Sequence, residues 1–436
     1  MINKITEFLI YPHTHNAPGV NKDMNGLKNS KSKPIQCPGR KLVGVGVYAT
    51  VFLLPVYLVK FSIFGIPTNA LEILMLAVFA SWLIFLKPGS KIFLELGSRK
   101  KILLSLSLIF SGLLLSTLIN KNYTVGFGII KSWFVLPLLF SFVVMAAIPG
   151  ERKKNIFYAY YSSAAAVSFL GLFYFFAGKV TFDGRLEVFF NSPNYLAMYL
   201  APGIIIGAYF WKRIYCESKK IKIFYILSSL SILITFYFTY SYAAWAAVIA
   251  SIFSVQIIKN KNKITKSRVL AGGAVVLLII IFLQWNSPKF QNAINLSERS
   301  SLASRVMVWK AAGKIISDNP LRGIGPGNFQ NKYLEYQKYF PPYLEWAVSH
   351  PHNLYLTFWL SGGILGLVGF LALIFFWFRE MVKKEKNSLW AISFAIMLYF
   401  LIHGLADTTY FKNDLAVIFW INFAIGLSCI ICRRRG

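Results

Sequence analysis

The residues best suited to chemistry lie in one long polar segment, residues 286–350, and just after it. His350 and His352 flank a proline, and Asn353 follows immediately before a hydrophobic run. An unperturbed imidazole has a pKa of about 6.5, so it can accept a proton at neutral pH. A histidine and an asparagine at a helix start could orient a hydroxyl nucleophile and take its proton. We therefore predict His352 as a general base with Asn353 and His350 as substrate-binding residues; the alternative for these residues is capping at the membrane interface.

Arg305, earlier in the same segment, is the second catalytic candidate. Its planar guanidinium suits two-point contact with a phosphate or diphosphate at a membrane surface. Residues 300–316 have the spacing of an amphipathic helix, which Asp318-Asn-Pro320 would end. Its predicted apolar stripe consists of Leu302, Val306, Trp309 and Ile316. The alternative is an arginine that contacts only water or lipid head groups.

A second polar segment, residues 183–194, could supply a further cation. Arg185 follows Asp183-Gly, and Asn194 closes the sequence Asn-Ser-Pro-Asn just before an apolar run. Arg185 could bind the same diphosphate as Arg305, and Asn194 could bind substrate or simply cap the next helix.

Metal ions and nucleotides are not expected in the reaction. No Asp-x-Asp sequence occurs in the segments expected outside the membrane, so arginines instead of Mg²⁺ would neutralise a diphosphate. For zinc, the two histidines lack a cysteine, a carboxylate or a third histidine at ligand spacing. The glycine-rich residues 323–328 lack the Lys-Ser/Thr ending of a phosphate-binding loop. They predict a tight turn into a helix over 328–340 with Asn328 as its N-cap. We predict no metal and no cofactor.

The composition indicates a membrane protein. Of 436 residues, 56% are hydrophobic and only 14% are charged, against about 25% charged in soluble domains. Apolar runs of the length that crosses a bilayer recur along the chain. We predict an all-α polytopic membrane protein with about twelve transmembrane helices. These are residues 43–59, 68–86, 102–119, 124–147, 155–177, 194–211, 223–240, 241–258, 269–285, 351–377, 388–404 and 413–432. Residues 1–41 would be a polar tail, and residues 42–436 one helical bundle that includes the loop 286–350.

The positive charge predicts the orientation of the helices. The net charge is +30, and 32 of the 46 lysines and arginines fall in the tail, the short alternate loops and the C-terminal run 433–435. Cytoplasmic loops are the basic ones in such proteins. We expect both termini in the cytoplasm and the loop 286–350 outside. The charge would bind anionic membrane lipids, and we predict no nucleic-acid partner.

The spacing around His352 resembles a known family. His352-Asn353 is followed by nine residues and then Gly363-Ile-Leu-Gly366. This pattern resembles the O-antigen ligase and polymerase superfamily, in particular the lipopolysaccharide O-antigen ligases, which have about twelve spanning helices and one large periplasmic loop. The stretch from Ser304-Arg305 to Trp309, and residues 184–194, are also similar to segments of that superfamily.

The resemblance implies a reaction at the outer side of a bacterial cytoplasmic membrane. A glycan would pass from a polyprenyl diphosphate carrier to an acceptor hydroxyl on a glycolipid or glycan, such as lipid A-core, with inversion of the anomeric centre. Arg305 and Arg185 would stabilise the leaving diphosphate. His352 would deprotonate the acceptor hydroxyl, and Asn353 would orient the histidine or a sugar.

One position departs from the family pattern. Many members have Ser-Arg-Gly/Ala in the outside turn before the eighth helix, where this chain has Ser241-Tyr242-Ala243. Tyr242 therefore stands where the family has a diphosphate-binding arginine. Either Arg185 covers this role, or diphosphate affinity is reduced, or the protein is not a competent ligase.

Three other functions remain open. A polysaccharide polymerase of the same superfamily would use a carrier-linked glycan as acceptor, and a protein glycosyltransferase would use a protein hydroxyl. A glycolipid transporter is the alternative from a different class. Transporters place polar sites at the membrane midplane on broken helices, whereas the polar residues of this chain lie at the predicted outer interface.

Overall fold

The computed structural model describes residues 38–63, 65–86, 99–214, 217–295, 300–341, 345–384 and 386–428. Most of the expected polar tail, residues 1–37, and the basic run 433–435 lie outside this part of the chain. Residues 38–41, which we assigned to the tail, form the first turn of a helix instead.

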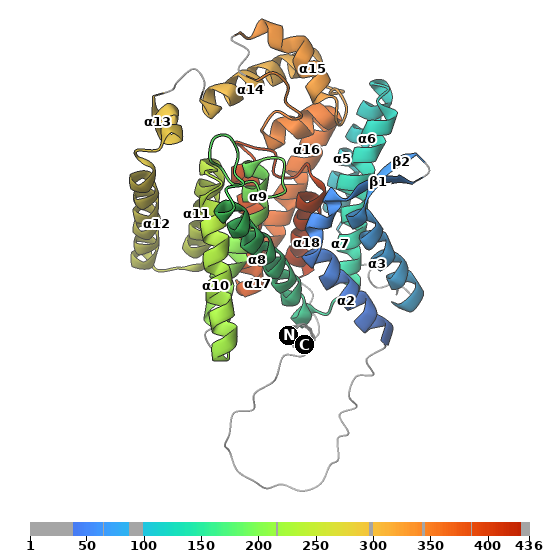
Figure 1. Ribbon diagram of the computed structural model, residues 1–436. Helices are drawn as coiled ribbons and strands as arrows, with labels where there is room; N and C mark the ends of the chain where they lie inside the picture. The colour runs from blue at the N-terminus through green and yellow to red at the C-terminus, as the bar shows by residue number, and fades with distance from the viewer. Residues whose placement is uncertain are drawn as a thin grey trace, which may run out of the picture.

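Helices dominate the described residues (Figure 1). They are α2 (Pro38–Phe52), α3 (Ala70–Leu86), α5 (Lys100–Ile119), α6 (Tyr123–Ile129), α7 (Leu136–Ala147), α8 (Lys154–Phe176), α9 (Pro193–Ile214), α10 (Lys219–Tyr237), α11 (Tyr242–Lys259), α12 (Lys263–Gln284), α13 (Pro288–Ile294), α14 (Ser301–Asp318), α15 (Phe329–Tyr336), α16 (Leu354–Val382), α17 (Ser388–His403) and α18 (Asn413–Ser428). Short 3-10 or π turns occupy Leu54–Leu58, Ile130–Val135, Gly150–Arg152 and Gln337–Tyr339.

The predicted class, a polytopic membrane protein, is confirmed. Each of the twelve predicted runs coincides with a helix, and α6, a π turn and α7 together form one of them. Within the described residues, seven helical segments are long and apolar enough to span a bilayer, and α3, α17 and α18 are shorter apolar helices. The total of twelve spans stays a prediction.

A β-hairpin shows that the description as all-α is incomplete. Strands β1 (Lys60–Ile63) and β2 (Ile66–Asn69) pair antiparallel where the sequence suggested only a break between two helices. Gly65, with φ of 77°, makes the left-handed turn that the hairpin needs. The hairpin leads to Glu72, which is buried and pairs with Lys131 at 2.8 Å. Lys131 is thus a paired structural cation, as expected for a charge within an apolar run.

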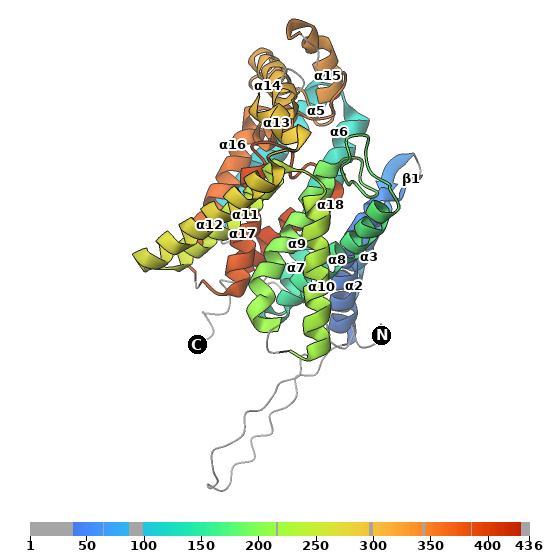
Figure 2. The ribbon, with the colours of Figure 1, turned by 60° about the vertical axis from the view of Figure 1, so that its left-hand side comes forward.

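The loop 286–350 folds into α13, α14 and α15, which lie over one end of the bundle (Figures 1 and 2). The predicted helix at 300–316 is confirmed as α14, and Ser300 caps it by accepting a hydrogen bond from Ala303 N. The predicted stripe is wrong at Leu302 and Val306, whose exposed fractions are 42% and 38%. The face that packs against α15 and α16 uses small residues between larger ones: Met307, Val308, Ala311, Ala312, Ile315 and Ile316.

The glycine-rich turn docks onto a break in α16. Gly363 has φ of 62° and ψ of −164° inside this helix, so the carbonyl of Leu360 is released to accept a hydrogen bond from Ile324 N at 2.7 Å. A Cβ on Gly323 would lie 2.7 Å from Gly363 N. The turn predicted at 323–328 is therefore present, and it fixes the loop to the membrane bundle by close backbone contact.

Asn328 is the N-cap residue of α15, as predicted, but its side chain makes no capping hydrogen bond to that helix. Instead its Nδ2 donates to the carbonyl of Ile324 at 2.7 Å, and its Oδ1 accepts from Asn122 Nδ2 at 2.7 Å. Asn328 therefore ties the turn to the start of α6.

We predict that Gly112→Ala destabilises the bundle. Helices α5 and α16 are in extensive contact. A Cβ on Gly112 would lie 2.7 Å from Gly366 N and also meet the carbonyl of Gly362. Forced over-packing costs about 1–3 kcal/mol, so Tm in detergent should fall. Gly128→Ala is the control because nothing lies within 4 Å of its Cβ position. Equal Tm values for the two variants would contradict this packing.

Candidate active site

Asp407 is the point on which the candidate site converges. It lies in the turn after α17, is fully buried, and its backbone N donates to the carbonyl of His403 at 2.9 Å. Its Oδ1 also accepts from Thr408 N at 2.8 Å. The first hydrogen bond fixes the backbone of Asp407, and the second fixes the orientation of its carboxylate.

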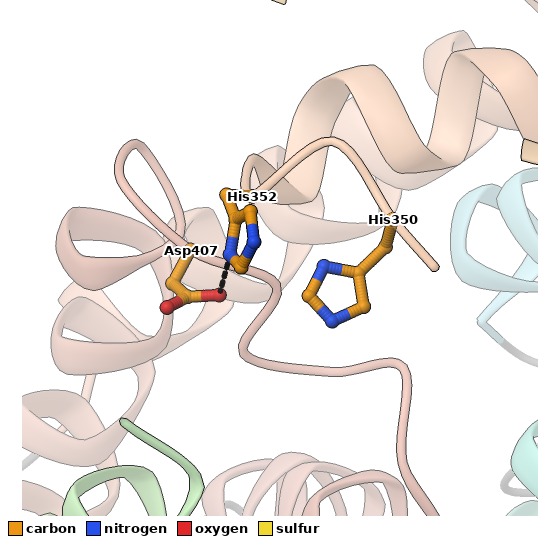
Figure 3. Close-up of side chains that lie close together, drawn as sticks. All are labelled: His350, His352 and Asp407. Carbon is orange, nitrogen blue, oxygen red and sulfur yellow. Dashed lines mark hydrogen bonds and ion pairs between the residues drawn. The ribbon is translucent and has the colours of Figure 1, made fainter. Parts of the chain in front are cut away.

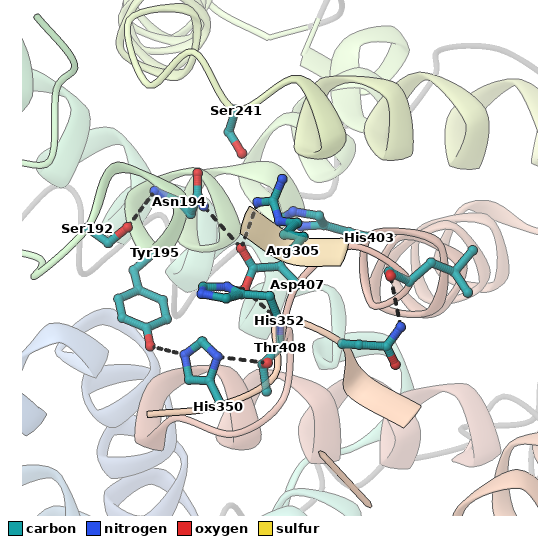
Figure 4. Close-up of polar contacts among 12 residues, drawn as sticks. Ser192, Asn194, Tyr195, Ser241, Arg305, His350, His352, His403, Asp407 and Thr408 are labelled. Carbon is teal, nitrogen blue, oxygen red and sulfur yellow. Dashed lines mark hydrogen bonds and ion pairs between the residues drawn. The ribbon is translucent and has the colours of Figure 1, made fainter. Parts of the chain in front are cut away.

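Three side chains from separate elements contact this carboxylate (Figure 4). His352 Nδ1 lies 3.0 Å from Oδ1, and Asn194 Nδ2 donates to Oδ2 at 3.1 Å. Arg305 Nη2 lies 3.6 Å from Oδ2. Burial would raise the pKa of Asp407, but the charge and hydrogen bond of His352 and the charge of Arg305 outweigh it, and the pKa lies well below its usual value. Asp407 is therefore a carboxylate at neutral pH.

The backbone just before α16 aims His352 at Asp407. His352 has φ of 47°, a left-handed conformation that non-glycine residues seldom adopt and that often marks a functional site. Trp309 Nε1 donates to its carbonyl at 3.4 Å, which connects α14 to this strained residue. The next residue, Asn353, caps α16: its Oδ1 accepts from Tyr355 N and Leu356 N, both at 3.0 Å.

The amide of Asn353 also has a partner. Its Nδ2 donates to the carbonyl of Leu405 at 2.9 Å, in the turn that carries Asp407. The contacts thus show that Asn353 caps a helix, which was the alternative for this residue. Its substrate-binding role stays a prediction.

His350 lies on the other side of His352 from Asp407 (Figure 3). The centroids of the two imidazole rings are 4.7 Å apart. His350 Nε2 is 2.6 Å from the hydroxyl of Tyr195, and Nδ1 is 3.1 Å from Thr408 Oγ1. Burial, together with the neighbouring His352, lowers the pKa of His350 to about 4. His350 is therefore neutral at pH 7, and both of its nitrogens are in hydrogen bonds.

Arg185 reaches the same cluster through Asn194. Its Nη2 donates to Asn194 Oδ1 at 2.7 Å, and its Nε donates to the carbonyl of Thr239 at 2.8 Å. Burial lowers the pKa of Arg185, and the nearby Arg305 adds to this effect, but an arginine stays charged at any pH that proteins experience. The structure thus brings together Arg305, Arg185 and Asn194, three predicted site residues, around one carboxylate.

Tyr242 is engaged elsewhere. Its hydroxyl donates to Gln284 Oε1 at 3.0 Å and lies 3.1 Å from Ser287 Oγ, at the junction of α12 and α13. Arg185 contacts the carbonyl of Thr239 in the turn before Tyr242. The guanidinium that contacts this turn therefore belongs to Arg185, in the segment 183–194. The substrate-binding role of Tyr242 stays a prediction.

The possibility of a metal site has to be weighed again in three dimensions. His350, His352 and Asp407 present ligand atoms that all lie within 4.8 Å of one another. A carboxylate is thus near the histidines, contrary to our argument from spacing. However, His352 Nδ1 and Asp407 Oδ1 are at hydrogen-bonding distance, and both nitrogens of His350 have other partners. A metal would have to break these bonds, and the absence of a metal in the reaction stays a prediction.

Asp407 lies just after the apolar run 388–404, and a charge beside such a run is a sequence signal for a paired or functional residue. The histidine at the end of that run, His403, is not its partner, because His403 Nδ1 lies 2.8 Å from the hydroxyl of Tyr399. Tyr195 and Thr408, which hold His350, carried no such signal because hydroxyl residues are common at helix ends.

The arrangement can carry out proton transfer beside an anion. Because Asp407 accepts from Nδ1 of His352, the Nε2 of that imidazole is the nitrogen that bears the lone pair. A buried carboxylate in this position orients the ring and stabilises the imidazolium after it takes a proton. Arg305 and Arg185 bring two guanidiniums to the site, where Arg305 pairs with Asp407 and Arg185 lies 4.0 Å from Asp183. Their remaining N–H groups can stabilise an anionic group that reaches them.

Comparison with known proteins supports the resemblance found in the sequence. Residues 227–371 match the family model described as O-Antigen ligase. A protein of Rickettsia conorii named "Putative polysaccharide ligase" is 26% identical over 157 residues. That match covers 34% of this chain and 36% of the relative's length. The family segment contains Arg305, His352 and the two glycines at 363 and 366, and it does not include Arg185 or Asp407.

We predict that His350 makes stability depend on pH. The unfolded chain binds a proton on His350 near pH 6.5, whereas the folded chain does so only near 4. Stability should therefore fall as the pH drops from 6.5 towards 4. His350→Gln should show a smaller loss of Tm between pH 7 and pH 5 than the parent, and Arg322→Gln should behave as the parent. An equal loss in the parent and the His350 variant would contradict the shifted pKa.

Proposed function

Because residues 227–371 match the O-antigen ligase family model, we propose that this chain transfers a glycan from a polyprenyl diphosphate carrier to an acceptor hydroxyl. One observation carries the proposal: His352 and Arg305 meet at the same buried carboxylate, Asp407, at 3.0 and 3.6 Å. A base and a cation are thus held within the length of one sugar–diphosphate linkage.

The chemistry follows from the two roles of this site. His352 Nε2 takes the proton of the acceptor hydroxyl, whose oxygen attacks the anomeric carbon of the donor glycan. The bond from that carbon to the diphosphate oxygen breaks, and the carrier leaves as polyprenyl diphosphate. Arg305 and Arg185 stabilise the charge that develops on the leaving group. A single displacement inverts the anomeric centre.

Asp407 is a positioning residue in this scheme. It holds His352 through Nδ1 and stabilises the imidazolium formed after proton transfer. The sugar–diphosphate bond carries its own activation, so the reaction needs no nucleotide and, in our proposal, no metal or other cofactor.

We place the reaction at the outer face of a bacterial cytoplasmic membrane. This placement rests on the basic loops, which the charge rule assigns to the cytoplasm, and on the position of α14 at one end of the bundle. The proposal includes twelve spans, both termini inside, and a glycolipid such as lipid A-core as acceptor. The names of the matching family and relative support a ligase in preference to a polymerase.

We predict that His352→Ala lowers glycan transfer by about 10²–10⁴-fold, the usual contribution of a general base. The assay uses purified protein with carrier-linked glycan and lipid A-core. The result that would contradict the assignment is transfer at the parent rate by a folded His352→Ala protein.

Addition of a chelator should leave the parent rate unchanged. Loss of activity that added metal restores would contradict the metal-free mechanism.

Arg305→Gln should lower transfer by about 10²–10³-fold, the value of one preorganised group that stabilises developing charge. Arg322→Gln is the matched control, because this exposed arginine belongs to the same loop and contacts only Asn319 Oδ1, at 3.4 Å, among the described residues. Equal transfer rates for the two arginine variants would show that Arg305 does not contribute to the reaction.

The orientation can be tested by labelling. In a cysteine-free background, Arg322→Cys should react with a membrane-impermeant maleimide in spheroplasts, because the loop is predicted outside. Lys261→Cys, between α11 and α12, should react only after the membrane is broken. The reverse pattern would place the site in the cytoplasm and exclude the proposed reaction.

A further inference from the structure

A cavity beside His350 is not explained by the transfer chemistry described above. It has a volume of about 230 Å³. Its walls come from the hairpin region, α6 and the π turn after it, the glycine-rich turn, the start of α16 and the turn before α18. The cavity is thus built from segments distant in sequence, and it is lined by His350, whose ring centroid is 4.7 Å from that of His352.

The charged groups that line this cavity are all basic. Lys60 and Lys412 belong to its wall, and within the described residues the lining contains no carboxylate. Burial lowers the pKa of Lys412 to about 8, and the positive charge of Lys60 adds to this effect. The charge of Asp414 acts in the opposite direction, but Asp414 and Lys412 form no ion pair among the described residues. Two neighbouring cations of this kind favour an anionic ligand.

The ammonium group of Lys412 is held by aromatic faces instead of hydrogen bonds. It lies 3.8 Å from the ring centroid of Tyr195 and 4.7 Å from that of Phe190. In the part of the chain that the structure describes, this ammonium donates no hydrogen bond, so its donors remain available to a ligand. Cation–π contacts fix the position of the charge without using its N–H groups.

Aromatic side chains also supply flat walls. Tyr57, Trp133 and Phe411 line the cavity together with Tyr195. Such rings pack well against the C–H faces of a sugar, while Ser349 and Asn413 supply polar groups for its hydroxyls. A bare phosphate would satisfy the lysines but would leave these ring faces without contact. The volume is suited to one sugar ring.

We propose that this cavity binds a single sugar ring that carries a carboxylate or a phosphate group, with the anion at Lys412 and Lys60. The inference rests on the proposed function, which makes glycans the ligands of the site. The hydroxyl of Tyr195 bonds to His350, whose ring is 4.7 Å from that of His352. A ring bound here would thus place its neighbouring sugar linkage or hydroxyl beside the catalytic histidine, and the reaction would select glycans with an acidic residue.

The test measures binding of defined probes to the full chain in lipid nanodiscs, by ligand-observed NMR. Methyl β-D-glucuronide and glucose 6-phosphate are the charged sugars, methyl β-D-glucoside is the neutral sugar, and inorganic pyrophosphate is the anion without a ring. At least one charged sugar should bind about tenfold or more tightly than the glucoside, the value of one hydrogen bond to a charged group. The tighter of the two identifies the preferred anion.

Lys412→Met should remove this preference, because it keeps the length of the side chain and loses the charge. Lys60→Met should reduce it. Lys332→Met, on the exposed face of α15 where Lys332 pairs with Glu335, should leave it unchanged. Equal affinity for charged and neutral sugars, or a preference that survives in folded Lys412→Met, would overturn the proposal. Binding of pyrophosphate that depends on Lys412, with no binding of either sugar, would also overturn it.

Failure of the proposed sugar site can be distinguished from failure of the proposed transfer reaction. His352→Ala should bind the charged sugar as the parent does while it loses transfer. If the parent binds the sugar through Lys412 but transfers no glycan from a polyprenyl diphosphate, the proposed reaction fails and the binding site stands. If transfer occurs and no charged sugar is preferred, the reaction stands and the site fails.

Discussion

The site depends on the buried carboxylate of Asp407. A buried, ionised Asp407 is tolerated only where positive charge and hydrogen bonds surround it, because an unpaired buried charge is strongly destabilising. That requirement brings together His352 at the start of α16, Arg305 on α14 and Asn194 on α9. One electrostatic constraint therefore gathers residues from the external loop and from the membrane bundle. The same constraint gives His352 its orientation and holds the guanidinium of Arg305 beside it.

The glycines of the family pattern have a mechanical role in this arrangement. Gly363 breaks α16, which frees a backbone carbonyl that the glycine-rich turn then uses, and Gly323 permits the close contact. Gly366 lets α5 approach the same helix at Gly112. Helix α14, which carries Arg305, packs on the turn and on α16 through small side chains. The spacing from His352-Asn353 to the two glycines therefore connects His352, the proposed base, with the point where the loop that carries Arg305 is fixed to the bundle.

Local features of the site were predictable from the sequence, and long-range ones were not. His352 and Asn194 were predicted from residue type and position at a helix start, and Arg305 and Arg185 because cations are few in the polar segments beside apolar runs. The partner of His352 could not be assigned, since Asp407 is 55 residues away and only helix packing brings the two together. Periodicity predicted α14 but was wrong about its buried face at Leu302 and Val306, because alanines were not counted as apolar contacts. The hairpin was missed because its four-residue strands are too short to give an alternating pattern.

The most direct test of the central claim is a double-mutant cycle between Asp407 and His352 for glycan transfer by folded protein. If Asp407 acts by holding and stabilising His352, the double variant Asp407→Asn with His352→Gln should be no slower than the slower single variant. If the two losses multiply instead, Asp407 acts independently of His352, and the account of one carboxylate that organises the site is contradicted.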